Sequence, residues 1–365
     1  MRMRMRKKKN AAGASARAQT RPAGPDAYAV SGRSPASCEL LRSRVPIIGA
    51  AIGRLVNLTV GFTVNCPDPA VKERFDSILA GLPQGSGSVG LRSFICRYFD
   101  ELLTTGTAVG EIVPSPKGVG LWLVPAGDVV LRRPDGDPCR TEFIRAADMT
   151  PVSRPELMFM TALSPAAGEI RGRPLTEGLA EYCGTLGTIF EMIEKNRRRT
   201  GNVRYCVSCG ADESGGESAE SLARTLAEGW SQAMSSDTVR DFICVGDVKV
   251  STIGADSKEP DVEAPVRQLL EQIVAKTGVP PFLLGLSWST TERMASLQTD
   301  LLTTELENYR TLLTPVIEKI AAFVLRFLGS SAVPEVVWDE ITLQDRLSEA
   351  KAAYYDRLAQ NGGRG

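Results

Sequence analysis

The cysteine pair Cys206 and Cys209 is the pattern in this chain that comes nearest to a metal-binding motif. Eight cysteines are scattered along the sequence, and only the run Cys206-Val207-Ser208-Cys209 has ligand-like spacing. A closed zinc site needs four ligands, and the chain has neither a second C-x-x-C nor a histidine to complete one. We therefore expect no bound metal, and interpret the pair as two residues of a β-strand in a reducing compartment. A metal shared between subunits of an assembly is the alternative.

The absence of histidine also excludes most familiar enzyme chemistry. It removes the usual general base and every Ser-His or Cys-His nucleophile pair. No G-x-x-x-x-G-K-[ST] run occurs, so the chain lacks a phosphate-binding loop of that kind. The sequence thus predicts a protein that is not an enzyme and holds no cofactor. A cysteine-dependent metal or redox protein is the minor alternative.

Residues 262–328 carry the most regular pattern, and their apolar side chains have helical spacing. A first stripe occupies positions i, i+3, i+4, i+7 and i+8: Val266, Leu269, Leu270, Ile273 and Val274. Gly278 ends this helix, and Pro280 and Pro281 prevent its continuation. After a polar loop, a second stripe keeps the 3.6-residue period from Leu297 to Phe327. Pro315 lies in the middle of that stripe and is expected to kink the helix.

Upstream of this region, helical periods alternate with strand periods. Strands are indicated where apolar residues recur at every second position, and helices where they recur every three to four. The expected elements are a helix over 35–55, a strand over 56–64, a helix over 91–103 ended by Gly106, strands within 107–160 including a hairpin around 134–136, a helix from 174 to about 199, a small α/β insert over 201–260, a short strand over 333–338 and a last helix over 343–359.

Charge is divided unevenly between the N-terminal segment and the rest of the chain. Residues 1–44 hold eleven Lys/Arg and two Asp/Glu, a balance of +9, so the remainder of this neutral chain has a balance of −9. The Ala/Gly/Ser/Pro-rich residues 1–35 predict a disordered basic tail, either simply solvated or in contact with DNA or an acidic scaffold. No apolar run reaches membrane-spanning length and no secretory signal is recognisable, so we expect a soluble, cytoplasmic protein.

Three motifs together resemble the portal proteins of tailed bacteriophages, the head–tail connector family. The first is Gly278-Val279-Pro280-Pro281-Phe282-Leu283-Leu284-Gly285, similar to the family turn G-V-P-P-x-x-L-G. The second, Leu102 to Ile112, looks like a helix-to-strand segment, and the third is Gly172-Arg173-Pro174-Leu175. The resemblance covers roughly residues 36–345, with the motifs in the family's order.

The resemblance implies an α+β, portal-like fold with an α/β wing, a helical stem, a small α/β clip and a long kinked helix, with subunits arranged in a ring. The implied ranges are a disordered basic tail (1–35), a wing-like region (36–173), a stem helix (174–200), a clip-like insert (201–260), a second stem helix and turn (261–285), a tunnel loop (286–296), the kinked helix (297–328) and a short C-terminal region in place of a larger crown (329–365).

The same resemblance implies roles for individual residues. The stem-to-loop turn would comprise Gly278, Val279, Pro280, Pro281 and Gly285, and the loop facing the DNA channel Ser287, Trp288, Ser289, Thr290, Thr291, Glu292 and Arg293. Small hydroxyl residues suit sliding contact with phosphates, and Trp288 either packs under the loop or stacks on DNA. Arg197, Arg198 and Arg199 suit the negative C-terminal end of the stem helix; contact with terminase or DNA is the second interpretation.

The implied function is mechanical. A ring of subunits, by family a dodecamer, would sit at one capsid vertex of the virion, after assembly in the host cytoplasm. Double-stranded DNA would pass through it without sequence specificity during packaging and ejection. The implied partners are the large terminase subunit, the major capsid or scaffold protein and head-completion or adaptor proteins, with no membrane. The alternative is a non-viral DNA-binding or scaffold adaptor that binds through the basic tail.

Overall fold

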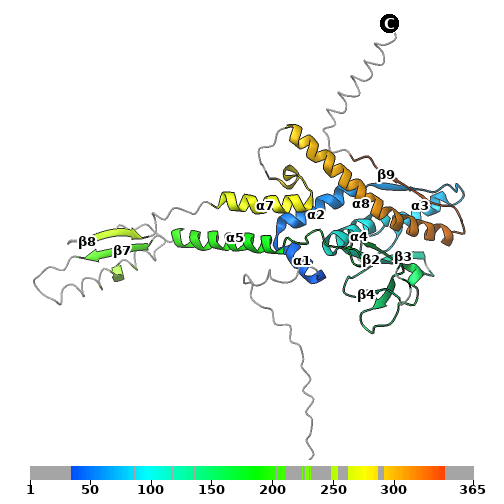
Figure 1. Cartoon of the computed structure of the whole chain (residues 1–365), viewed down its shortest axis with the longest axis horizontal. Coiled ribbons are helices and arrows are strands. Elements are labelled where there is room, and N and C mark those ends of the chain that lie inside the picture. The colour runs from blue at the N-terminus through cyan, green and yellow to red at the C-terminus, as the bar shows by residue number, and fades with distance from the viewer. Residues whose placement is uncertain are drawn as a thin grey trace, which may run out of the picture. The chain divides into compact units, whose positions relative to one another are not determined.

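The computed structural model describes residues 34–341 except 86, 117, 135–136, 138, 202–203, 210–223, 225–226, 230, 232–247, 254–261 and 287–291 (Figure 1). The chain divides into two compact units, one comprising Met1–Gly184 with Val274–Gly365 and the other Thr185–Ile273. Its helices are α1 (Pro35–Arg44), α2 (Pro46–Thr59), α3 (Lys72–Gly81), α4 (Leu91–Thr105), α5 (Ala180–Gly201), α7 (Glu263–Thr277) and α8 (Glu292–Phe327), with short 3-10 helices η2 (Pro155–Leu157) and η3 (Pro281–Leu284). Its strands are β1 (Phe62–Asn65), β2 (Thr107–Ser115), β3 (Gly118–Val124), β4 (Val129–Arg132), β5 (Glu142–Arg145), β6 (Met158–Ala162), β7 (Arg204–Cys209), β8 (Val248–Ile253) and β9 (Glu335–Trp338).

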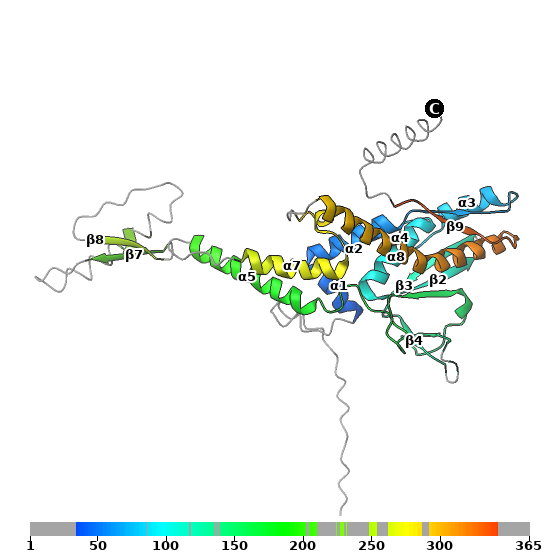
Figure 2. The same ribbon diagram turned by 45° about the horizontal axis from the view of Figure 1, so that its top comes forward.

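The core of the first unit forms around α4, the amphipathic helix expected over 91–103. Its apolar face is fully buried, including Phe94, Ile95, Tyr98, Phe99 and Leu102. The helix packs against α1, α2, α3, α8 and β2 (Figures 1 and 2). The Tyr98 hydroxyl lies 3.0 Å from both the Ala108 carbonyl oxygen and the Thr161 hydroxyl, so its polar atom is satisfied within the core.

An antiparallel sheet of order β3-β2-β6 follows α4 in the chain. Its glycine at position 110 lies against the Phe159 ring, and a Cβ there would be 2.4 Å from that ring. A second apolar cluster connects this sheet with the β4–β5 hairpin, and comprises Val109, Val124, Val129, Phe143 and Met158. The strands expected on either side of 134–136 are confirmed as β4 and β5.

The strand expected over 56–64 is wrong in its first half. Helix α2 continues to Thr59, because Ile52, Leu55, Val56 and Thr59 extend one buried helical face. Only β1 is extended, and it pairs with β9 from the other end of the chain, Phe62 opposite Trp338. The expected strand near 333–338 is therefore confirmed, with a partner that local periodicity did not indicate.

Helix α8 runs without interruption for 36 residues through Pro315. Two cations attach it to other elements of the first unit. Arg310 Nε donates to the Thr59 carbonyl oxygen (3.2 Å), and its guanidinium lies 5.2 Å from the centroid of the Trp338 ring. Lys319 Nζ donates to the Met158 carbonyl oxygen (2.6 Å). These two contacts, which we call the α8 clamp, lie on either side of the proline.

The second unit contains the hairpin of β7 and β8, with parts of α5 and α7. Cys206 pairs with Ser251 and Cys209 with Val248, so the two cysteines lie in one strand, as expected. Helix α5 begins at Ala180 rather than at Pro174. The preceding residues form turns, and Gly178 has the left-handed φ of +85°, which a continuing helix does not allow.

The tail was expected over 1–35; residues 1–33 lie outside the described residues, whereas Ser34 caps α1 and Pro35 begins it, so the tail is shorter than expected. The last helix, expected over 343–359, also lies outside the described residues. Among the helices that are described, none combines the length and apolar character needed to cross a membrane.

Candidate functional site

The three sequence motifs meet in the first unit, although as many as 183 positions separate their outermost residues. We call the segments 102–112, 172–175 and 278–285 together the joint. The first two are in direct backbone contact. Gly106 ends α4 with a left-handed φ of +82°, and a Cβ on it would lie 2.5 Å from the Arg173 carbonyl carbon. A Cβ on Gly172 would lie 2.2 Å from the Gly106 carbonyl oxygen. Each glycine is therefore required by the close approach of the other segment.

Hydrogen bonds connect these two segments through Leu163. Leu163 N donates to the Gly106 carbonyl oxygen (2.8 Å), and Arg173 N donates to the Leu163 carbonyl oxygen (2.7 Å). The Gly172 N–H donates to Thr107 Oγ1 (2.8 Å), and Leu175 N donates to the Leu103 carbonyl oxygen (2.9 Å). The residues leading to α5 are thus held against the end of α4.

The remaining motif, residues 278–285, is a compact turn between α7 and α8. Gly278 has a φ of +68°, its N–H donates to the Val274 carbonyl oxygen (2.9 Å), and Val279 is fully buried after it. Pro280 and the short helix η3 follow, and Gly285 closes the turn with a φ of +76°. Leu286 N then donates back to the Pro281 carbonyl oxygen (3.0 Å). The prolines fix their own φ angles, and the glycines allow the positive φ angles that other residues avoid. The local sequence therefore determines the conformation of this turn.

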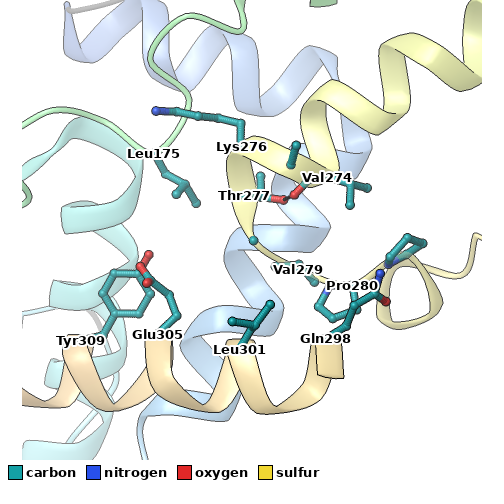
Figure 3. Close-up of a pocket in the computed structure, with 13 residues that line it drawn as sticks. Leu175, Val274, Lys276, Thr277, Val279, Pro280, Gln298, Leu301, Glu305 and Tyr309 are labelled. Atoms are coloured by element: carbon teal, nitrogen blue, oxygen red, sulfur yellow. Dashed lines mark hydrogen bonds between the residues drawn. The ribbon is translucent and has the colours of Figure 1, made fainter. Parts of the chain in front are cut away.

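A pocket of about 430 Å³ lies between this turn and α8 (Figure 3). Leu175 of segment 172–175 and Leu301 of α8 point into it from opposite sides, and Val279 and Pro280 form the wall between them (Figure 3). Figure 3 also shows Lys276 extending away from Glu305, which lies beside Tyr309. The pocket thus combines residues of the segments 172–175 and 278–285, and the hydrogen bonds above connect segment 172–175 with segment 102–112.

The polar groups of this pocket lie among packed apolar side chains. Burial raises the pKa of Tyr309 far above its usual value, and the nearby Glu305 carboxylate raises it further. The Tyr309 ring packs on Phe99 with centroids 5.1 Å apart. Gln298 Oε1 is buried with no hydrogen-bond partner among the described residues. Within the same described part of the chain, no three His, Cys, Asp or Glu side chains gather as a metal site.

The structure places the predicted site residues as follows. The turn residues Gly278, Val279, Pro280, Pro281 and Gly285 lie in the joint, whereas the loop residues 287–291 are outside the described part. Helix α8 begins at Glu292, five residues before the expected position 297, so Glu292 and Arg293 belong to its first turn. Arg197 is exposed on α5, in which Arg198 and Arg199 also lie.

The α8 clamp was missed by sequence reasoning. Arg310 and Lys319 look like ordinary exposed positions of an amphipathic helix, but each donates a hydrogen bond to a carbonyl oxygen of another element. Burial lowers the pKa of each, opposed by Asp339 and Glu307 near Arg310 and by Glu156 near Lys319. A basic residue between apolar positions of a helix is only a weak indication of such a contact. The neighbouring sequence does not identify which carbonyl oxygen accepts the hydrogen bond.

No protein-family model matches this sequence, and neither does any curated protein. Solved structures do match. A chain in the virion of a native gene transfer agent (GTA) particle is 15% identical, with 93% of this chain and 95% of that chain covered and a TM-score of 0.60. A chain in the neck of the native GTA particle computed with C12 symmetry is 14% identical, with 92% and 89% covered and a TM-score of 0.59. An HK97-family phage portal protein from Corynebacterium diphtheriae is 12% identical, with 85% and 96% covered and a TM-score of 0.44.

At these identities the likeness concerns the fold. This chain therefore has the fold of a chain found in the virion and neck of GTA particles, over nearly its whole length. The fold shared with chains of a GTA virion and neck agrees with the resemblance to head–tail connector proteins that the three motifs indicate.

Proposed function

We propose that this protein is a portal: a ring of identical subunits at one capsid vertex, through which DNA enters and leaves and to which the tail is joined. The observation that carries the proposal is the shared fold over 93% of this chain and 95% of a GTA virion chain. The joint supports it, because segment 172–175 contacts segment 102–112 and, through Leu175, lines one pocket with the turn at 278–281.

In this role the chain contributes positioning and rigidity. Residues 286–291 connect η3 to α8, and both neighbours are firmly held, the turn by its prolines and its buried Val279 and α8 by the clamp. The hydroxyl-rich sequence of Ser287–Thr291 suits weak contact with passing phosphates, since each strong ion pair would slow sliding. The expected partners are DNA in the channel, the large terminase subunit, capsid or scaffold protein and head-completion proteins, in a virion.

Negative-stain electron microscopy with light-scattering mass of the purified protein tests the proposal. Twelve copies of the 39.3-kDa chain, 12 × 39.3 or about 472 kDa, should form rings whose hole admits a DNA duplex. A small species that binds DNA only through residues 1–33 would favour the adaptor alternative. Stoichiometric zinc in the purified protein would favour the cysteine-dependent alternative.

A further inference from the structure

A groove of about 520 Å³ lies in the first unit between one face of the β3-β2-β6 sheet and the β4–β5 hairpin. Its floor contains three residues at one level of the sheet, because Glu111 of β2 is directly opposite Trp122 on β3 and Met158 on β6. Side chains that are directly opposite point to the same face, with Cβ atoms about 4.5–5.5 Å apart. The half-buried Glu111 carboxylate therefore lies between an indole ring and a methionine side chain.

The unpaired charges of this groove are negative. Arg145 is the one basic residue among the described residues that line it, and its Nη2 already lies 3.2 Å from Asp148 Oδ2. Glu111 and Asp128 also line the groove, and within the described part of the chain neither is within ion-pair distance of a basic side chain. Arg171, near the hairpin, donates to backbone carbonyl oxygens. The groove is therefore suited to a cation.

The exposed ring of Trp122 favours one kind of cation. This side chain is 45% exposed, and a cation paired with the opposite Glu111 lies within the range of about 6 Å over which a ring attracts it. A guanidinium group fits best, because it is planar, forms two parallel hydrogen bonds with a carboxylate and stacks on aromatic rings. Met158 and Val152 supply apolar surface for the aliphatic part of an arginine side chain.

The first nine residues of the chain supply such groups. They read Met-Arg-Met-Arg-Met-Arg-Lys-Lys-Lys, and in an extended chain alternate side chains point to opposite sides. Arg2, Arg4 and Arg6 would then share one side. The 24 residues 10–33 connect this segment to α1. They can span about 80 Å, which exceeds the size of a compact unit of about 250 residues, whose radius of gyration is about 18 Å.

We propose that the arginines of residues 1–9 dock in this groove of the same chain, with one guanidinium between Glu111 and Trp122, and that DNA releases them. An exposed ion pair is weak by itself. The tether, however, presents the segment to the groove at an effective concentration on the order of millimolar. DNA has a much higher density of negative charge and competes for the same side chains. The groove thus restrains the tail until DNA is present, and the contact needs no ring.

Limited digestion of the full-length protein with trypsin at low salt tests the contact. Mass spectrometry would follow cleavage after residues 2–9, with cleavage after Arg17 as the internal reference. Glu111→Gln and Trp122→Leu should each accelerate the first cleavages about two- to fivefold, because cleavage follows the population of the released segment. Glu318→Gln, a change of equal charge on exposed α8, should leave the rate unchanged. At about 1 M salt the effect of Glu111→Gln should disappear.

Binding of linear DNA gives an independent measurement. The E111Q/D128N variant should bind DNA about two- to fivefold more tightly than the wild type, because its tail is already released. D300N/E318Q removes the same charge from exposed positions of α8 and corrects for the change in the net charge of the body.

Equal cleavage of the wild type and the Glu111→Gln variant, or equal gains in DNA affinity for the two double variants, would overturn the contact and leave the portal function unaffected. Faster cleavage of the wild type on dilution would also overturn it, since the segment would then dock on another copy. If no rings form while cleavage behaves as expected, the portal function fails and the contact stands.

Discussion

Gly110 shows how one absent side chain determines the packing of the first unit. A Cβ at this position would lie 2.4 Å from the Phe159 ring, which is itself enclosed by Phe94 and Tyr98. The ring cannot retreat, so Gly110→Ala should lower the free energy of unfolding by about 1–3 kcal/mol, as overpacking of a full core does. Denaturant unfolding would measure this loss.

Gly53→Ala is the matched control for that substitution. Gly53 lies inside α2, and a Cβ there meets no atom within 4 Å. Alanine should therefore stabilise the protein, by about 0.5–1 kcal/mol, through its better helix propensity. Equal destabilisation by both alanines would contradict the packing argument.

Glu101 on α4 should make stability depend on pH. Burial raises its pKa above 4.5, Asp100 and Glu39 raise it further, and Thr105 and Arg42 oppose the shift. The folded state therefore holds this proton more tightly than the unfolded state. The resulting stabilisation is complete below the unfolded pKa and is lost as the pH rises through the folded one.

The Glu101→Gln variant removes this proton exchange while keeping a similar side chain. Its stability relative to the wild type should increase as the pH rises from about 4.5, the ordinary value, to 7. Urea unfolding of both proteins across this range would measure the difference. A difference that stays constant with pH would show that Glu101 does not titrate differently in the folded state.

At the scale of elements, Pro315 and the α8 clamp act together. Proline cannot donate a hydrogen bond within the helix, and this leaves the Thr311 carbonyl without its helical partner. Arg310 and Lys319 hold the helix on either side of that weak point. We expect Pro315→Ala to straighten α8 against both contacts, and to reduce the yield of packaged DNA more than ring formation. Normal packaging by this variant would contradict a role for the kink.

Removing the clamp should affect stability rather than the kink. Arg310→Leu loses the donor to the Thr59 carbonyl and the contact with Trp338, which should cost about 1.5–3 kcal/mol, as for hydrogen bonds of charged groups. Arg310→Lys is the conservative comparison; it keeps the charge and should recover part of the loss. Thermal or denaturant unfolding would measure both, and an unchanged Arg310→Leu variant would show that the contact is dispensable.

Sequence reasoning succeeded where structure is local. The stripes of α4, α7 and α8, the proline-rich turn and the β4–β5 hairpin follow from spacing and turn residues within short windows. Sequence reasoning failed where contacts with residues far away in the chain determine the secondary structure. Thr59 looks like part of an alternating strand, but it is buried beneath α8 and receives Arg310 from 251 positions away. The start of α5 was predicted too early. Pro174 is favourable in the first turn of a helix, but the left-handed φ of Gly178 does not allow a helix to continue through it.

The candidate site was predictable to a similar extent. The residues of the joint were identified as three separate motifs, but their mutual contact was not, because no local pattern specifies that Gly106 and Gly172 must face each other. The positive φ of Gly106 was indicated by its position after a helix, whereas the close approach of Arg173 to it was not. Distances of this kind depend on tertiary packing.

At the scale of the whole molecule, the tail and the remaining chain carry opposite charges, which under the proposed portal function would separate two kinds of DNA contact. The segment 1–44 carries +9 and the rest −9. A protein that held DNA tightly in its channel would need a basic body, and its affinity would fall steeply with salt. A −9 body instead suits a channel through which DNA moves, and leaves tight binding to the basic tail.

Deleting residues 1–33 distinguishes these contributions. The cut leaves Ser34, whose Oγ accepts from the Ser37 N–H (3.1 Å) and so caps α1, and the folded part should remain intact. The truncated protein should still form rings, since the proposed portal function depends on the folded part and not on the tail. Its affinity for linear DNA at low salt should fall severalfold or more, because nine of the eleven basic residues in the segment are removed. Loss of ring formation together with DNA binding would instead favour an adaptor organised by its tail, and unchanged DNA affinity would place the binding on the acidic body.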